Sequence, residues 1–128
     1  MSDGQFQQCL DQKLPQIQYT VCHVYKELHV PLPKVLLICA VKRHHHRFYP
    51  TQPAFADGNG NPRPGLIIDN GVTYDPGTGF KDWFSISHKA MKGTARPAHY
   101  VILHDDGKND PADIQMMVGV LLCLKQIC

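Results

Sequence analysis

The feature that most constrains the fold is an uninterrupted apolar run of seven residues at positions 35–41. Pro31 and Pro33 precede the run and a basic segment follows it, so its length is limited on both sides. A run this short is typical of a strand that is buried on both faces. Such a strand requires neighbouring strands and a sheet that helices cover.

The segments around this run predict helices at both ends of the chain and more strands between them. Ser2 and Gln5 have the spacing of a capping box, and apolar residues then recur every three or four positions. Pro15 should kink this first helix or split it. Short strands are predicted at 66–68, 83–86 and 100–103, a loop at 51–65, and a last helix that Asp110 caps and Pro111 begins. The predicted fold class is an α/β domain, with a mixed sheet and flanking helices.

Length and composition limit the protein to one globular unit. The 128 residues suffice for one domain, and 43% hydrophobic with 19% charged residues is a globular balance. The net charge of +2 says little about partners. Five cysteines without a CxxC pair favour reduced thiols, and the apolar run at 116–124 is too short to span a membrane. No secretory leader pattern opens the chain, so we expect a cytoplasmic protein with no membrane partner.

The charges are unevenly distributed along the chain. No acid occurs between Leu28 and Ala56 or between Trp83 and His104, and both blocks contain lysine, arginine and histidine. These blocks are either solvated loops or a surface that binds an anion. If the strand continues past position 41, its alternation places Arg43, His45 and Arg47 on one face, about 6–7 Å apart, a spacing suited to a polyphosphate backbone.

The run His44-His45-His46 allows a second interpretation, a site for zinc or copper. Two imidazoles on one face of a strand could supply two ligands. A metal site also needs further ligands nearby, and the sequence shows no second cluster of histidine or cysteine. The flanking arginines would repel a cation, so this interpretation is the weaker one.

Several motifs in order resemble the Piwi domain of the Argonaute family. The segment at 42–48, KRHHHRF, resembles its K-R-H-H-x-R motif, and Gly60-Asn61-Pro62 with the later DWFSISH at 82–88 resembles two further signatures. The segment GTARPAHY at 93–100 is similar to its G-T-S-R-P-x-H-Y, and SDGQF at 2–6 is similar to its S-E-G-Q-F. Together these motifs span almost the whole chain.

The resemblance implies a partial Piwi domain over residues 1–128, with a ribonuclease H-like fold. It implies small guide RNA and paired target RNA as partners, together with proteins of a silencing complex, in RNA-mediated gene silencing. By position in the motifs, the residues implied in contacting the guide backbone are Lys42, Arg43, His45, Arg47, His88 and Arg96. Arginine forks suit this role because they bind phosphate at two points.

The resemblance implies no catalytic residue and no cofactor in this chain. In the family members that cut RNA with magnesium, the metal-binding carboxylates precede the S-E-G-Q-F motif and the last catalytic histidine follows the region matched here. Asp105 and Asp106 are adjacent, so their side chains should diverge, and His99 and His104 are better explained as structural residues. The alternatives are a magnesium-dependent RNA endonuclease, if the chain is part of a longer one, and a His-rich metal-binding protein. Missing sheet neighbours predict a marginally stable or insoluble chain.

Overall fold

A computed structural model describes residues 3–74 and 79–127, with side chains for 4–74 and 79–123. The expected cap at Ser2 lies outside the described residues. All four predicted strands and both terminal helices are present. The elements in chain order are η1 Asp3–Gln5, α1 Phe6–Gln8, η2 Cys9–Lys13, α2 Leu14–Glu27, β1 Leu36–Val41, η3 Pro53–Phe55, β2 Leu66–Ile68, β3 Lys81–Ile86, β4 Ala98–Asp105 and α3 Pro111–Ile127.

The four strands form one sheet in the order β1-β4-β3-β2. The sequence predicts a mixed sheet, and the three pairings among the described residues are antiparallel. Between Leu37 and Ile38 the register of β1 against β4 shifts by one residue. The prediction that Asp110 caps the last helix is confirmed, because its carboxylate accepts a hydrogen bond of 2.8 Å from the Ala112 amide.

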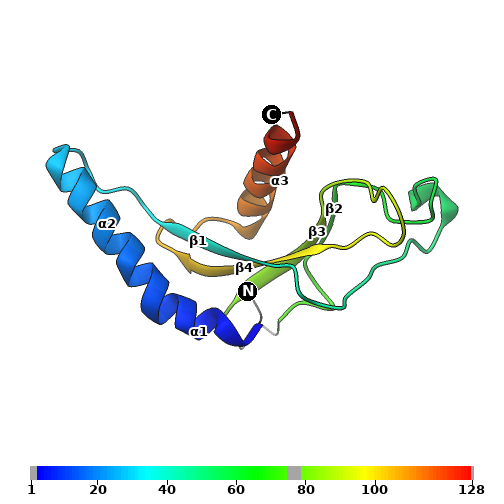
Figure 1. Cartoon of the computed structure of the whole chain (residues 1–128), viewed down its shortest axis with the longest axis horizontal. Coiled ribbons are helices and arrows are strands. Elements are labelled where there is room, and N and C mark those ends of the chain that lie inside the picture. The colour runs from blue at the N-terminus through cyan, green and yellow to red at the C-terminus, as the bar shows by residue number, and fades with distance from the viewer. Residues whose placement is uncertain (1–2, 75–78, 128) are drawn as a thin grey trace.

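Helices cover both faces of this sheet, so the α/β layered class is confirmed (Figure 1). Along β4, Val101 and Leu103 face the first helical segment, while Tyr100 and Ile102 face α3. One core therefore joins β4 and β1 to the start of the chain; its buried members are Phe6, Cys9, Cys39, Val41, Val101 and Leu103. The other core joins the opposite face to α3; its buried members are Trp83, Tyr100, Ile102 and Ile114.

The predicted disturbance at Pro15 takes the form of a wider helical turn. The segment η2 is a π-helix that ends directly before α2, where proline occupies one of the first helical positions. Proline has no N–H to donate to the carbonyl four residues earlier, and a π turn is one way to accommodate that loss. The chain consequently continues as one long arm, α1 to α2, that extends beyond the edge of the sheet (Figure 1).

Much apolar surface stays exposed. The prediction that the first strand is buried on both faces holds for one face only, because Cys39 and Val41 are buried together on one side, whereas Ile38 is half-buried and Ala40 is exposed on the other. No residue of α2 is buried, and Tyr19 and Leu28 are among its exposed side chains. The apolar face that the sequence predicts for this helix therefore stays largely uncovered along α2. Within the described residues, no helix has both the length and the apolar character needed to cross a bilayer.

Candidate nucleic-acid interface

Both basic blocks leave the sheet at the same end. Val41, the last residue of β1, pairs with His99 at the start of β4, and Ser85 near the end of β3 pairs with Ala98. The segment after β1 and the segment between β3 and β4 therefore begin side by side. In Figure 1 the loops over 42–65 and 87–97 extend from this end of the sheet, opposite the arm of α2. The fold thus brings together two segments that are about 45 residues apart in the sequence.

The first basic segment packs against the aromatic ring of Phe84, a buried residue of β3. The prediction that the strand continues past residue 41 is wrong, because β1 ends at Val41. Alternation nevertheless persists: the rings of His44, His46 and Phe48 lie 5.4, 5.0 and 5.3 Å from the Phe84 ring, measured between centroids. Every second side chain is thereby held against the sheet.

The intervening residues differ from one another in exposure. Arg43 and His45 are exposed, and Arg47 is half-buried, with its Nη1 donating a hydrogen bond of 2.6 Å to the His46 carbonyl. Lys42, between Val41 and Arg43, is exposed as well. The row that strand alternation predicts at positions 43, 45 and 47 therefore stays a prediction, because this segment is not a strand and Arg47 is less exposed than Arg43 and His45.

A hydrogen bond joins the first basic segment, residues 42–48, to the second, residues 87–97. Nε2 of His44 donates to the Pro97 carbonyl at 2.9 Å. Arg43 precedes one partner of this bond and Arg96 precedes the other, and both arginines are exposed. The bond therefore sets how the chain at position 43 lies relative to the chain at position 96.

Burial lowers the pKa of His44 below its usual value of 6.5, and the nearby His46, His99 and Arg47 act in the same direction. The hydrogen bond to Pro97 opposes this effect. The Nδ1 atom of His44 is buried and has no partner among the described residues. A neutral imidazole with its proton on Nε2 fits this environment, because the carbonyl accepts that proton.

Asn61 forms a second connection that residue-by-residue sequence reasoning missed. Its side chain is 4% exposed; Nδ2 donates to the Gly93 carbonyl at 2.9 Å and Oδ1 accepts from the Ala95 amide at 2.8 Å. The Asn61 side chain thus makes the hydrogen bonds to Gly93 and Ala95 that a neighbouring strand would otherwise make, and it holds the backbone that leads to Arg96. The motif Gly60-Asn61-Pro62 was the sequence signal that could have pointed to this connection. Asparagine suits the position because its amide group both donates to and accepts from the backbone.

His88 and Arg96 are both exposed near the same end of the sheet. His88 comes two residues after β3, and its Nδ1 lies 3.0 Å from the Ser87 hydroxyl. Arg96 lies between two buried neighbours, Ala95 and Pro97, which hold the backbone while its side chain extends outward. Every residue predicted to contact RNA except Arg47 is therefore exposed.

His99 and His104 both have carboxylate partners that the sequence did not reveal. Nε2 of His99 lies 2.6 Å from Oδ2 of Asp82, with both side chains buried, and Nε2 of His104 lies 2.7 Å from Oδ1 of Asp106. Asp82 also accepts a 2.9 Å hydrogen bond from the Tyr74 amide. The Asp82–His99 pair depends on the register of β3 on β4, whereas His104 and Asp106 are only two positions apart, and this spacing was a local signal for their pairing.

Several acids of the described residues accept hydrogen bonds from backbone amides. Asp105 accepts hydrogen bonds from the amides of Gly107 and Asn109, and Asp106 accepts one from the Val35 amide, so the two adjacent side chains do diverge. Donation by Val35 is the leading cause that lowers the pKa of Asp106. Among the described residues no group of three or more histidines, cysteines or acids could hold a metal ion. This donor set does not fit a magnesium centre.

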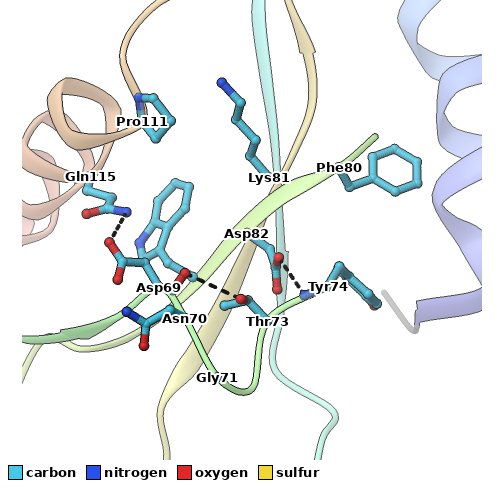
Figure 2. Close-up of a pocket in the computed structure, with 11 residues that line it drawn as sticks. Asp69, Asn70, Gly71, Thr73, Tyr74, Phe80, Lys81, Asp82, Pro111 and Gln115 are labelled. Atoms are coloured by element: carbon cyan, nitrogen blue, oxygen red, sulfur yellow. Dashed lines mark hydrogen bonds between the residues drawn. The ribbon is translucent and has the colours of Figure 1, made fainter. Parts of the chain in front are cut away.

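A hollow of about 540 Å³ lies at the other end of β3, between the chain after β2 and the start of α3. Figure 2 shows the Gln115 amide directed at the Asp69 carboxylate, 3.4 Å away, and Lys81 on the adjoining strand. Two acids, Asp69 and Asp82, line this hollow with Lys81 as the single cation among its lining residues. None of the predicted RNA contacts lines it, and its charge does not suit a phosphate backbone.

The chain is similar to known proteins along its whole length. The sequence profile of the Piwi domain matches residues 1–128. Protein argonaute 18 of Oryza sativa subsp. japonica is 34% identical over 131 residues, which cover 100% of this chain and 11% of that protein. Protein argonaute of Schizosaccharomyces pombe is 36% identical over 116 residues, covering 91% of this chain and 13% of that protein.

The fold agrees with these sequence matches. The crystal structure of Kluyveromyces polysporus Argonaute with a guide RNA superimposes with a TM-score of 0.75 at 28% identity, covering 91% of this chain and 15% of that one. The chain thus spans about an eighth of the length of the relatives it matches. The ribonuclease H-like class and the resemblance of the motifs are both confirmed. This chain belongs to the Piwi domain family of the Argonaute proteins.

Proposed function

We propose that this chain binds the sugar-phosphate backbone of a small guide RNA at the end of the sheet where the two basic blocks meet. Arg43, His45 and Arg47 contact consecutive phosphates from one segment, with Lys42 beside them. Arg96 and His88 contact the same strand from the other segment. Because the contacts are to phosphate, they position the RNA without reading its sequence. This places the chain in RNA-mediated silencing as a binding element.

The observation that carries the proposal is the hydrogen bond from His44 to the Pro97 carbonyl. It joins the two acid-free segments directly beside Arg43 and Arg96, whose side chains are exposed. The predicted row of side chains beginning at Arg43 gives donors at regular intervals along an RNA strand. The solved relative that contains a guide RNA supports the same partner.

Two other functions have less support. Magnesium-dependent RNA cleavage requires converging carboxylates, whereas Asp82, Asp105 and Asp106 bond to backbone amides and, in two cases, to histidines. Metal binding by the histidine run requires further ligands nearby, and among the described residues no group of three or more histidines, cysteines or acids lies close enough to hold a metal ion. Cleavage of labelled RNA by the purified chain with magnesium would favour the first alternative. Stoichiometric zinc uptake that His44→Ala abolishes would favour the second.

The direct test measures the affinity of the chain for single-stranded RNA by fluorescence anisotropy at several salt concentrations. The chain is kept soluble by fusion to a carrier protein, and the carrier alone is the blank. Arg43→Ala and Arg96→Ala should each weaken binding about 10-fold, as expected for loss of a charged hydrogen bond. Each should also reduce the slope of log affinity against log salt by about 0.7. The loss should be equal for RNAs of unrelated sequence.

Lys26→Ala provides the matched control, because it removes one positive charge from α2, far from both basic segments. This variant should leave affinity and salt slope unchanged. If Arg43→Ala and Arg96→Ala behave like Lys26→Ala, the two segments do not bind RNA together and the proposal is wrong.

A further inference from the structure

An exposed aromatic residue, to which the proposed phosphate contacts give no role, directly follows the first basic segment. His44, His46 and Phe48 of that segment pack on Phe84, and Tyr49 comes next along the chain, two residues after Arg47. Tyr49 is 68% exposed there. An exposed tyrosine directly after a row of cations combines two features of proteins that bind single-stranded RNA, a charged track and a stacking surface.

A second exposed aromatic lies beside Tyr49. Phe55, at the end of η3, is 61% exposed, and both rings line a hollow of about 390 Å³. Its other lining residues are Pro50, Thr51, Pro62, Arg63, Pro64 and Leu66. The volume lies within the range of about 300–1,000 Å³ that small-molecule sites occupy. Three prolines limit the motion of the walls, so the rings need little further ordering when a flat group enters.

The charge around this hollow favours an anionic strand over an apolar protein segment. Arg63 lines the hollow, and it donates through Nε to the Ala56 carbonyl at 3.3 Å, while its other four N–H groups bond to no described residue. Lys92 lines a neighbouring hollow of about 480 Å³ that also includes Tyr49. The nearest acid in this loop, Asp57, already accepts hydrogen bonds from the amides of Asn59 and Asn61.

We propose that Tyr49 and Phe55 form a stacking subsite for one unpaired nucleobase of the RNA strand whose phosphates Arg43 and Arg47 hold. The inference rests on the proposed function, because the backbone contacts deliver the base to the hollow. Tyr49 supplies a face for the base and Phe55 closes the opposite side of the hollow. Arg63 and Lys92 hold the flanking phosphates. Because every base has a π-face, the subsite accepts all four bases and binds purines more tightly.

The test compares binding of oligo(A) and oligo(U) decamers by the carrier-fused chain. Tyr49→Ala and Phe55→Ala should each weaken binding about 5- to 30-fold, the loss expected for one stacked base. The preference for oligo(A) should shrink, and the salt slope should stay unchanged because no charge is removed. Tyr49→Trp should restore binding. Arg47→Ala, by contrast, should reduce the salt slope.

Tyr19→Ala is the control, since it removes a 74% exposed tyrosine from α2. A decamer with one 5-iodouridine should crosslink under ultraviolet light to Tyr49 or Phe55, as located by mass spectrometry. If both alanine variants bind like Tyr19→Ala while Arg43→Ala still weakens binding, the subsite is overturned and the phosphate contacts stand. If the unchanged chain binds no RNA, or binds a proline-rich peptide at this hollow instead, both proposals are overturned.

Discussion

Nε2 of His99 lies 2.6 Å from Oδ2 of Asp82, and both residues are buried: His99 is 5% exposed and Asp82 is 7% exposed. The His99 ring also stacks on Phe84, with 4.2 Å between ring centroids and 8° between planes. Phe84 in turn carries the rings of the first basic segment. Asp82 is therefore linked to the first basic segment through two stacked rings. It pairs with His99, His99 stacks on Phe84, and Phe84 contacts the rings of that segment.

Asp82→Ala should destabilise the chain by about 2–6 kcal/mol. The change leaves two donors, the part-buried Tyr74 amide and the buried His99 ring, without this acceptor, at about 1–3 kcal/mol each. Urea unfolding of the carrier-fused chain, followed by Trp83 fluorescence, measures the loss. Asp82→Asn keeps one acceptor oxygen and should cost less. Asp113→Ala, on the first turn of α3, is the control and should change stability by less than about 1 kcal/mol.

The sequence predicts elements well wherever the signal is local. The strand at 66–68 has the predicted bounds, and the capping pair Asp110 and Pro111 marks the start of α3. Contacts between distant residues could not be predicted in this way. Asp82 and His99 are 17 positions apart, and only the register of β3 on β4 brings them together.

Burial is the property that the sequence predicts least well here. The apolar pattern of the first helix predicts a stripe along one face, yet no residue of α2 is buried. Hydrophobic periodicity shows that a face is apolar and does not say which partner covers it. The same limit applies to β1, whose composition fits a central strand although it lies at the edge of this sheet. The six proposed RNA contacts came from motif positions, and the structure adds the hydrogen bonds that hold their backbone.

Asn61→Ala should loosen the segment that carries Arg96. The substitution removes the hydrogen bonds to the Gly93 carbonyl and from the Ala95 amide, and it leaves that buried amide unsatisfied at a cost of about 1–3 kcal/mol. Hydrogen exchange of the Ala95 amide should accelerate at least in proportion to this cost. The neighbouring variant Asn59→Ala should leave it unchanged, since the hydrogen bond of Asn59 is made by its backbone. Equal exchange rates in the two variants would contradict the connection.

Acidification should destabilise the fold through His44. Burial holds its pKa below 6.5, so the unfolded chain binds a proton more readily than the folded chain. The contribution of neutral His44 to stability is complete above pH 6.5 and is lost as pH falls toward the lower pKa of the folded state. His46, His99 and Arg47 face this ring and oppose its protonation, whereas the Pro97 carbonyl favours it.

The measurement for His44 is the urea midpoint between pH 7.5 and 5.5. His44→Gln retains a side-chain donor for the Pro97 carbonyl and cannot be protonated, so its midpoint should fall less steeply over this interval. His23→Gln, on the exposed face of α2, should keep the pH dependence of the unchanged chain. If His44→Gln and the unchanged chain lose stability in parallel, another group causes the effect.

The isolated chain should self-associate along β1. This strand lies at the edge of the sheet, and Ala40 exposes its surface there, so a second chain can add its own strand. Ala40→Lys should raise the monomeric fraction in sedimentation velocity over a series of concentrations, because a charge on an edge strand opposes such pairing. Ala112→Lys adds the same charge at an exposed position of α3 and should leave association unchanged. A reversible, cooperative melt of the unchanged chain as a soluble monomer would contradict this prediction, because it would show that the β1 edge needs no cover.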